Sequence, residues 1–123
     1  MLLFNDIKMK PGMVTHKNKI SRLAKNIQKD PSDTFSKFAL ALELLKDDGV
    51  EKAQVLFEAI LKQDPDYLGV YYHLGKLYHR REMYNLAKEM FTDGVRVAEK
   101  KNDSRTKSEL SEALIQLQYE IEE

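Results

Sequence analysis

Cysteine is absent from the 123 residues of the chain, which excludes a disulfide bond, a thiolate nucleophile and a cysteine-ligated metal. No apolar stretch approaches the roughly 20 residues that a membrane-spanning helix needs. The apolar run at residues 1–4 ends at Asn5, far short of the apolar core of a signal peptide. The absence of a membrane-spanning stretch and of a signal-peptide core predicts a cytoplasmic protein that has no membrane partner.

A net charge is also missing, because 20 Lys and Arg residues balance 20 Asp and Glu residues. A neutral chain produces no overall field that would attract nucleic acid, and we expect no nucleic-acid partner. The balance is uneven along the chain, since residues 1–30 hold seven Lys and Arg against two Asp. No aromatic side chains are interleaved with these basic residues to stack on bases, so a solvated face is the preferred interpretation.

Patterns typical of catalysis and of metal binding are lacking as well. His73 and His79 are six residues apart, which places them about 240° apart around a helix, so one helix cannot present both to a metal. No Ser, Thr or Lys lies in a nucleophile motif, and no glycine-rich loop resembles a phosphate cradle. We therefore expect no catalytic residue, no metal and no cofactor, and a protein that is not an enzyme.

Helical periodicity runs through most of the chain, and no segment of useful length has the pattern of a strand. The first apolar stripe has the spacing i, i+3, i+4, i+7 and consists of Ile20, Leu23, Ala24 and Ile27. Asp30-Pro31 and Asp64-Pro65 each end a helix, because the residue before proline is pushed out of the α region. The pattern predicts an all-α fold of about six helices, over residues 16–29, 34–46, 50–63, 67–80, 84–100 and 104–122.

The chain matches itself at an offset of 34 residues. Asp30-Pro31 falls on Asp64-Pro65, Ala53 falls on Ala87, and Phe57 falls on Phe91. A period of this length with two helices per repeat is typical of a helical solenoid. We expect a single domain over 16–123, preceded by an irregular segment, residues 1–15, that docks on the fold. Within the domain the expected parts are a partial repeat (16–29), two repeats (32–64 and 66–100) and a C-terminal capping helix (104–122).

The repeated residues resemble the tetratricopeptide repeat (TPR) family. In the second repeat they are Tyr71, Leu74, Gly75, Tyr78, Ala87 and Phe91, and in the first they are Leu40, Ala41, Leu44, Ala53, Phe57 and Pro65. The sequence departs from the family at Gly94, where alanine is usual, and at Glu99, where a closing proline is usual. The resemblance implies an antiparallel helix-pair solenoid, a TPR-like superhelix, in which the first helix of each repeat lines a concave groove that commonly binds extended peptides.

The resemblance assigns candidate peptide-binding residues to two stripes. The apolar stripe of the first repeat is Phe35, Phe38, Leu42 and Leu45. At the same offsets the second repeat has Gly69, Tyr72, Lys76 and His79, with His73 and Arg80 alongside. We call Tyr72, His73, Lys76, His79 and Arg80 the aromatic-basic stripe. The Lys/Asn/Arg clamp with which part of the family holds a peptide carboxylate is absent, because Phe38 and Leu42 occupy two of its positions.

The function predicted from these features is a non-catalytic interaction module that binds a protein or peptide of unknown identity. Lys76 and Arg80 lie one turn apart and are suited to an acidic group, although a solvated helix face is the simpler interpretation. An exposed apolar stripe is unusual on a monomer. It has three candidate covers: residues 1–15, a second copy that would make a homodimer, or a separate partner. The alternative function is therefore self-assembly through the apolar stripe.

Overall fold

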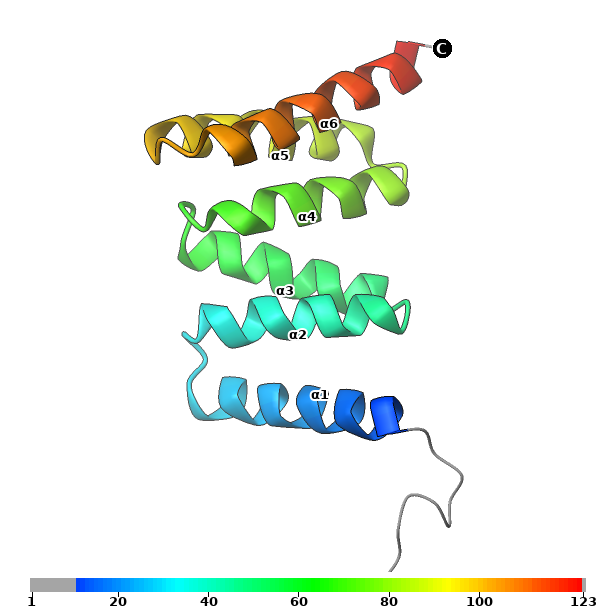
Figure 1. The fold of residues 1–123 in the computed structure, drawn as a ribbon, viewed down its shortest axis with the longest axis vertical. Coiled ribbons are helices and arrows are strands. Elements are labelled where there is room, and N and C mark those ends of the chain that lie inside the picture. The colour runs from blue at the N-terminus through cyan, green and yellow to red at the C-terminus, as the bar shows by residue number, and fades with distance from the viewer. Residues whose placement is uncertain (1–10, 123) are drawn as a thin grey trace, which may run out of the picture. The chain divides into compact units, whose positions relative to one another are not determined.

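The computed structural model describes residues 11–122, with side chains from Thr15 onward, and every element in this range is an α-helix (Figure 1). The helices are α1 (Pro11–Lys29), α2 (Thr34–Lys46), α3 (Val50–Gln63), α4 (Leu68–Arg80), α5 (Tyr84–Lys100) and α6 (Ser104–Glu122). The all-α prediction is confirmed. The chain divides into an N-terminal unit, residues 1–56, and a C-terminal unit, residues 57–123, which are described separately. None of the described helices is long and apolar enough to cross a membrane.

The N-terminal unit is built on α1 and α2, which pack against each other. They are antiparallel, since His16 near the start of α1 reaches Asp47 just beyond α2, while Asn26 donates to Ser36 Oγ at 3.4 Å near the opposite end. Leu23 of α1 is buried, as are Leu40 and Ala41 of α2. Leu23, one of the four residues in the stripe predicted for residues 20–27, therefore forms part of this core.

The helix expected to start near residue 16 begins at Pro11 instead, so residues 11–15 are not an irregular segment. Proline suits the first helical turn, because its missing N–H would have no intrahelical acceptor there and its fixed φ matches the helix. The docking expected for residues 1–15 thus concerns residues 1–10, which lie outside the described part of the chain.

The C-terminal unit packs α4 against α5 and α5 against α6 (Figure 1). Its buried repeat residues are Tyr71, Leu74, Gly75 and Tyr78 in α4 and Ala87 and Phe91 in α5. Leu110, Ala113 and Leu117 of α6 are buried as well. All six residues that carry the pattern of the second repeat are therefore core residues.

Two glycines of this unit allow helices to approach closely. A Cβ on Gly75 would lie 2.7 Å from Cδ1 of Phe91, and a Cβ on Gly94 would lie 2.9 Å from Cδ1 of Leu110. Both distances are too short for non-bonded carbon atoms. A Cβ on Gly94 would also lie 2.8 Å from Cβ of Tyr71, so α4 together with the Leu110 side chain of α6 leaves no room for the alanine usual at that position.

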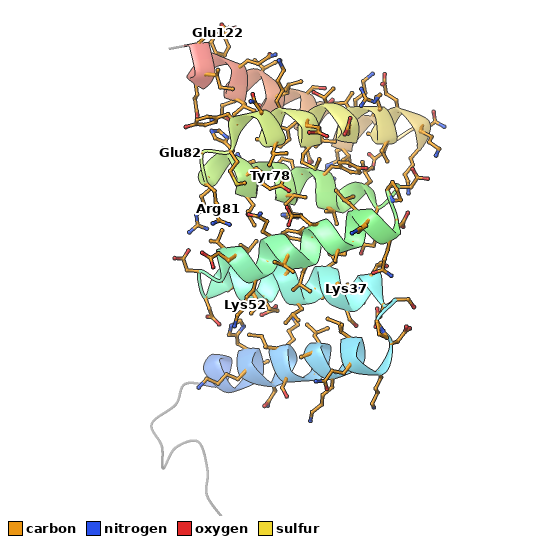
Figure 2. All side chains as sticks on the ribbon, turned by 180° about the vertical axis from the view of Figure 1, so that it is seen from behind. Lys37, Lys52, Tyr78, Arg81, Glu82 and Glu122 are labelled. Carbon is orange, nitrogen blue, oxygen red and sulfur yellow. The ribbon has the colours of Figure 1, made fainter. Side chains whose placement is uncertain are left out.

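Three turns contain a non-glycine residue in the left-handed conformation. Asp48 has φ 61°, Glu82 has φ 60° and Asn102 has φ 57°. Asp and Asn tolerate this conformation because their short side chains hydrogen-bond locally, whereas Glu does not. Of the three left-handed residues, Glu82 (labelled in Figure 2) therefore has the least favourable backbone conformation.

Replacing Glu82 with glycine is expected to raise the free energy of unfolding by about 0.5–1 kcal/mol, because glycine adopts φ near +60° without a Cβ clash. Urea unfolding of the full chain measures the change. Asn102→Gly is the matched control and should have a smaller effect. An E82G variant that is less stable than the wild type would contradict the strain assigned to this turn.

Candidate functional site

The apolar stripe lies on one side of α2 in the N-terminal unit. Phe35 is 70% exposed, while Phe38, Leu42 and Leu45 are half-buried. The buried residues of this helix are Ser36, Leu40, Ala41 and Glu43. Because α2 is apolar nearly all round, burial on every side would be usual. In the described residues, however, the ring of Phe35 at the N-terminal end of α2 is exposed.

The start of α2 is fixed by a side-chain cap next to this exposed ring. Asp33 Oδ1 accepts a hydrogen bond from the Ser36 N–H at 2.9 Å, and Asp33 Oδ2 accepts one from the Ser36 hydroxyl at 2.6 Å. These bonds favour the charged carboxylate and lower the pKa of Asp33. The cap holds the first turn of α2, from which Phe35 projects, in a defined geometry.

The aromatic part of the aromatic-basic stripe lies on α4 in the C-terminal unit. The His73 ring stacks on Phe57, with ring centroids 6.0 Å apart and planes at 14°, and Tyr72 meets His73 edge-on at 5.7 Å. Burial against these neighbours lowers the pKa of His73, so its imidazole is neutral near pH 7. His73 therefore supplies a flat, uncharged surface beside the half-buried Tyr72.

The other histidine of the stripe joins α4 to α6. His79 Nε2 lies 2.5 Å from Glu120 Oε2, and its ring meets Tyr84 edge-on at 6.0 Å. His79 thus already has an acidic partner within the chain. Lys76 and Arg80 are exposed, and Lys76 makes no ion pair in the described structure. The stripe therefore presents an aromatic pair followed by exposed positive charge.

The side of α4 opposite the stripe is used by the fold. The Tyr71 hydroxyl donates to the Pro65 carbonyl at 2.5 Å, and the Tyr78 hydroxyl, labelled in Figure 2, donates to Glu58 Oε2 at 2.5 Å. Burial, together with the hydrogen bond to the Glu58 carboxylate, raises the pKa of Tyr78. These tyrosines are structural and keep their protons, so they do not offer reactive groups.

A cluster of charged residues between α1 and α2 was not predicted from the sequence. Glu43 is only 4% exposed, yet its Oε2 lies 2.7 Å from His16 Nδ1, and His16 Nε2 lies 2.7 Å from Asp47 Oδ2. Lys19 and Lys46 approach Glu43 Oε1 at 3.2 and 2.9 Å. Together these five residues form an ionic clasp that fastens the N-terminal half of α1 to the C-terminal end of α2.

The protonation of the ionic clasp follows from its geometry. Carboxylates only accept hydrogen bonds, so His16 faces two of them with both ring nitrogens as donors, which requires the imidazolium form. Its bonds to Asp47 and then Glu43 raise the pKa of His16. The hydrogen bond from Lys46 contributes most to lowering the pKa of Glu43 to about 2. One feature of the sequence could have pointed to this cluster, because Glu43 is the one carboxylate inside the apolar helix 34–46.

The described residues offer no other candidate chemistry. No group of three or more His, Asp and Glu side chains in residues 15–122 has an arrangement that could hold a metal ion. Three hollows on the described surface lie at helix ends or along α1 and are open to solvent. The two stripes therefore stay candidates for recognition by their surface chemistry and not as an enclosed pocket.

No protein-family model matches the chain, and no curated protein matches it. Among solved structures, a tetratricopeptide repeat domain protein from Salinibacter ruber, solved by NMR, is 42% identical over 72% of this chain and 89% of that chain, with a TM-score of 0.67. A crystal structure of such a protein from the same organism is 41% identical over 70% of this chain and 97% of that chain, with a TM-score of 0.68. The TPR2B domain of yeast Sti1, solved in complex with pHsp70, has a TM-score of 0.79 over 89% of this chain and 87% of that chain. At 15% identity it shows similarity of fold alone.

Proposed function

The chain belongs to the tetratricopeptide repeat family, and from this premise we propose that it is a non-catalytic module that binds a peptide or protein segment. The aromatic-basic stripe of α4 is the proposed primary binding surface, and the apolar stripe of α2 is a second one. A cytoplasmic location stays a prediction from the sequence.

The division of α4 into two faces is the observation that carries this proposal. Tyr71, Leu74 and Tyr78 are buried and hold the helix in place, whereas Tyr72 is half-buried and Lys76 is exposed. Tyrosine is enriched at binding hot spots because it offers a large rigid ring together with a hydroxyl. The stripe therefore lies on a helix that the core holds in place, and Tyr72 and Lys76 keep exposed surface on it. The complex of the Sti1 domain with pHsp70 supports a protein or peptide as the ligand.

The chemistry of the stripe favours a ligand with an acidic group next to an apolar or aromatic one. The aromatic pair of Tyr72 and neutral His73 suits a flat or apolar side chain, and Lys76 and Arg80 suit a carboxylate one turn further along. The carboxylate clamp is not complete in this chain, so acidic side chains are better candidates than a peptide C-terminus.

The double variant Lys76→Ala/Arg80→Ala is expected to weaken binding of an acidic peptide roughly tenfold, because two exposed charges together contribute on the order of 1.4 kcal/mol. Fluorescence anisotropy with labelled peptides that differ only in Glu-to-Gln replacements measures the effect. Lys88→Ala/Lys101→Ala removes two exposed charges elsewhere on the C-terminal unit and should leave the affinity unchanged. If both double variants lose the same affinity for the acidic peptide, the loss reflects net charge alone. That result would contradict a binding site on α4.

Self-association is the second candidate function, and the exposure of Phe35 favours it. An aromatic ring that is 70% exposed within an apolar stripe is a typical component of an interface between copies. Light scattering over a range of micromolar concentrations separates the two functions. A mass that rises with concentration, and that Phe35→Ser returns to the monomer value, would favour self-assembly over a ligand.

A further inference from the structure

We propose that the last turn of α6, residues 118–122, imitates the ligand of the aromatic-basic stripe. In the free chain Glu120 occupies the place of the ligand's carboxylate, and Ile121 occupies the place of its apolar side chain. A ligand that carries an acidic residue next to an aliphatic one displaces this turn from α4 and α5. The inference names the chemistry of the ligand and the regulation of the stripe, so it rests on the proposed function.

The carboxylate of Glu120 lies on one residue of the aromatic-basic stripe. A carboxylate only accepts hydrogen bonds, so His79 Nε2 donates to Glu120 Oε2 at 2.5 Å. Lys76 and Arg80, one turn before and one residue after His79, are the exposed basic residues of the same stripe. The basic end of the stripe therefore already binds an acidic group, which comes from the chain itself.

A hollow beside this ion pair takes the aliphatic residue. It has a volume of about 440 Å³, and its apolar lining consists of Met83, Tyr84, Leu86 and Ile121. Tyr84 joins the two places, because its ring also meets the ring of His79 edge-on, with centroids 6.0 Å apart. Ile121 is still 47% exposed, so it fills the hollow only in part. Apolar surface that the chain's own isoleucine leaves uncovered thus remains for a ligand.

Few contacts hold the last turn of α6 in place. Leu117 is buried, whereas each of the residues 118–122 that follow is exposed. An ion pair with an exposed partner stabilises a fold only weakly, and helix ends open at low cost. The turn can therefore separate from α4 and α5 while Leu110, Ala113 and Leu117 keep the rest of α6 in the core. Figure 2 shows Glu82, in the turn between α4 and α5, and Glu122 at the same end of the C-terminal unit.

The sequence order of the two anchors defines the ligand more closely than the stripe alone does. Glu120 and Ile121 are adjacent, so the matching ligand has an acidic residue followed directly by an aliphatic one. The first repeat does not offer the same site, because Leu45 stands 34 residues before His79. The pair of anchors is therefore a property of α4 and its neighbours in the C-terminal unit.

A peptide with the sequence of residues 117–122 is the probe that tests the inference. It is titrated into the isotope-labelled full chain, and the amide signals of Tyr84 and Leu86 are followed by NMR. The variant Glu120→Gln/Ile121→Ser loses both anchors and should bind the peptide roughly tenfold more tightly than the wild type, because more of its chains have an open site. Glu122→Gln/Ile115→Ser makes the same two changes at exposed positions of α6 and should keep the affinity of the wild type.

Equal affinities of the wild type and the Glu120→Gln/Ile121→Ser variant would overturn the inference, because the last turn of α6 would then not compete with the peptide. A bound peptide that leaves the signals of Tyr84 and Leu86 unchanged would overturn it as well. Neither result decides the proposed function, which fails only if Lys76→Ala/Arg80→Ala retains full affinity for acidic peptides.

Discussion

Replacing Phe91 with alanine should lower the free energy of unfolding by about 3–5 kcal/mol, which is a large part of the stability of a small domain. The side chain is 0% exposed, and its ring on α5 lies against the backbone of Gly75 on α4. Truncation removes the ring from a site where the glycine backbone cannot fill the space. Urea unfolding followed by circular dichroism measures the loss, and Tyr119→Ala, at a position that is 70% exposed, should change stability little.

A double-mutant cycle tests the same contact in a variant that remains folded. Gly75→Ala alone should destabilise by about 1–3 kcal/mol through overpacking against the ring. In a Phe91→Leu background the same substitution should cost less, since the atoms that the new methyl group meets are removed. Additive effects of the two substitutions would contradict the close approach described for α4 and α5.

Truncating the buried carboxylate of the ionic clasp has the second large effect. Glu43→Ala should cost about 1.5–3 kcal/mol at pH 6, because His16, Lys19 and Lys46 lose a charged acceptor that the fold has already desolvated. Glu112→Ala, which removes an exposed carboxylate of α6, is the control. Equal stabilities of the E43A and E112A variants would show that the clasp contributes nothing.

The clasp also predicts a pH window. The pKa of His16 is raised above its ordinary value of 6.5. Its contribution to the free energy of unfolding is therefore complete below pH 6.5 and is lost as the pH rises through the raised pKa. The pKa of Glu43 is lowered from 4.5 to about 2. The contribution of Glu43 to the free energy of unfolding is therefore complete above pH 4.5 and is lost as the pH falls towards 2. The stability difference between the wild type and Glu43→Ala should therefore be largest between about pH 4.5 and 6.5.

Much of this fold follows from local sequence rules. The repeat pattern identified six of the buried residues of α4 and α5, and the Asp-Pro pairs located the ends of α1 and α3 at Lys29 and Gln63. These features depend on periodicity and on backbone sterics, which the sequence shows directly. The start of α1 was predicted too late because residues 1–15 were expected to be irregular, although Pro11 suits a first helical turn.

The polar contacts of the candidate site depend on tertiary packing and could not be predicted from the sequence. The sequence identifies Glu43 as an acidic residue in an apolar helix, but only the antiparallel placement of α1 brings His16 to it from 27 positions away. His79 was assigned to recognition, yet its pairing with Glu120, 41 residues later, requires α6 to lie beside α4. Whether either stripe binds a ligand stays a prediction.

Site-specific photo-crosslinking in cells tests most directly whether α4 is a recognition surface. A photoreactive phenylalanine analogue would replace Tyr72 in one full-length variant and Tyr119, on the exposed side of α6, in another. We expect discrete protein adducts from position 72 that disappear in the Lys76→Ala/Arg80→Ala background, and none of comparable yield from position 119. Adducts of equal yield at both positions, or none at position 72, would contradict a binding function for this face of α4.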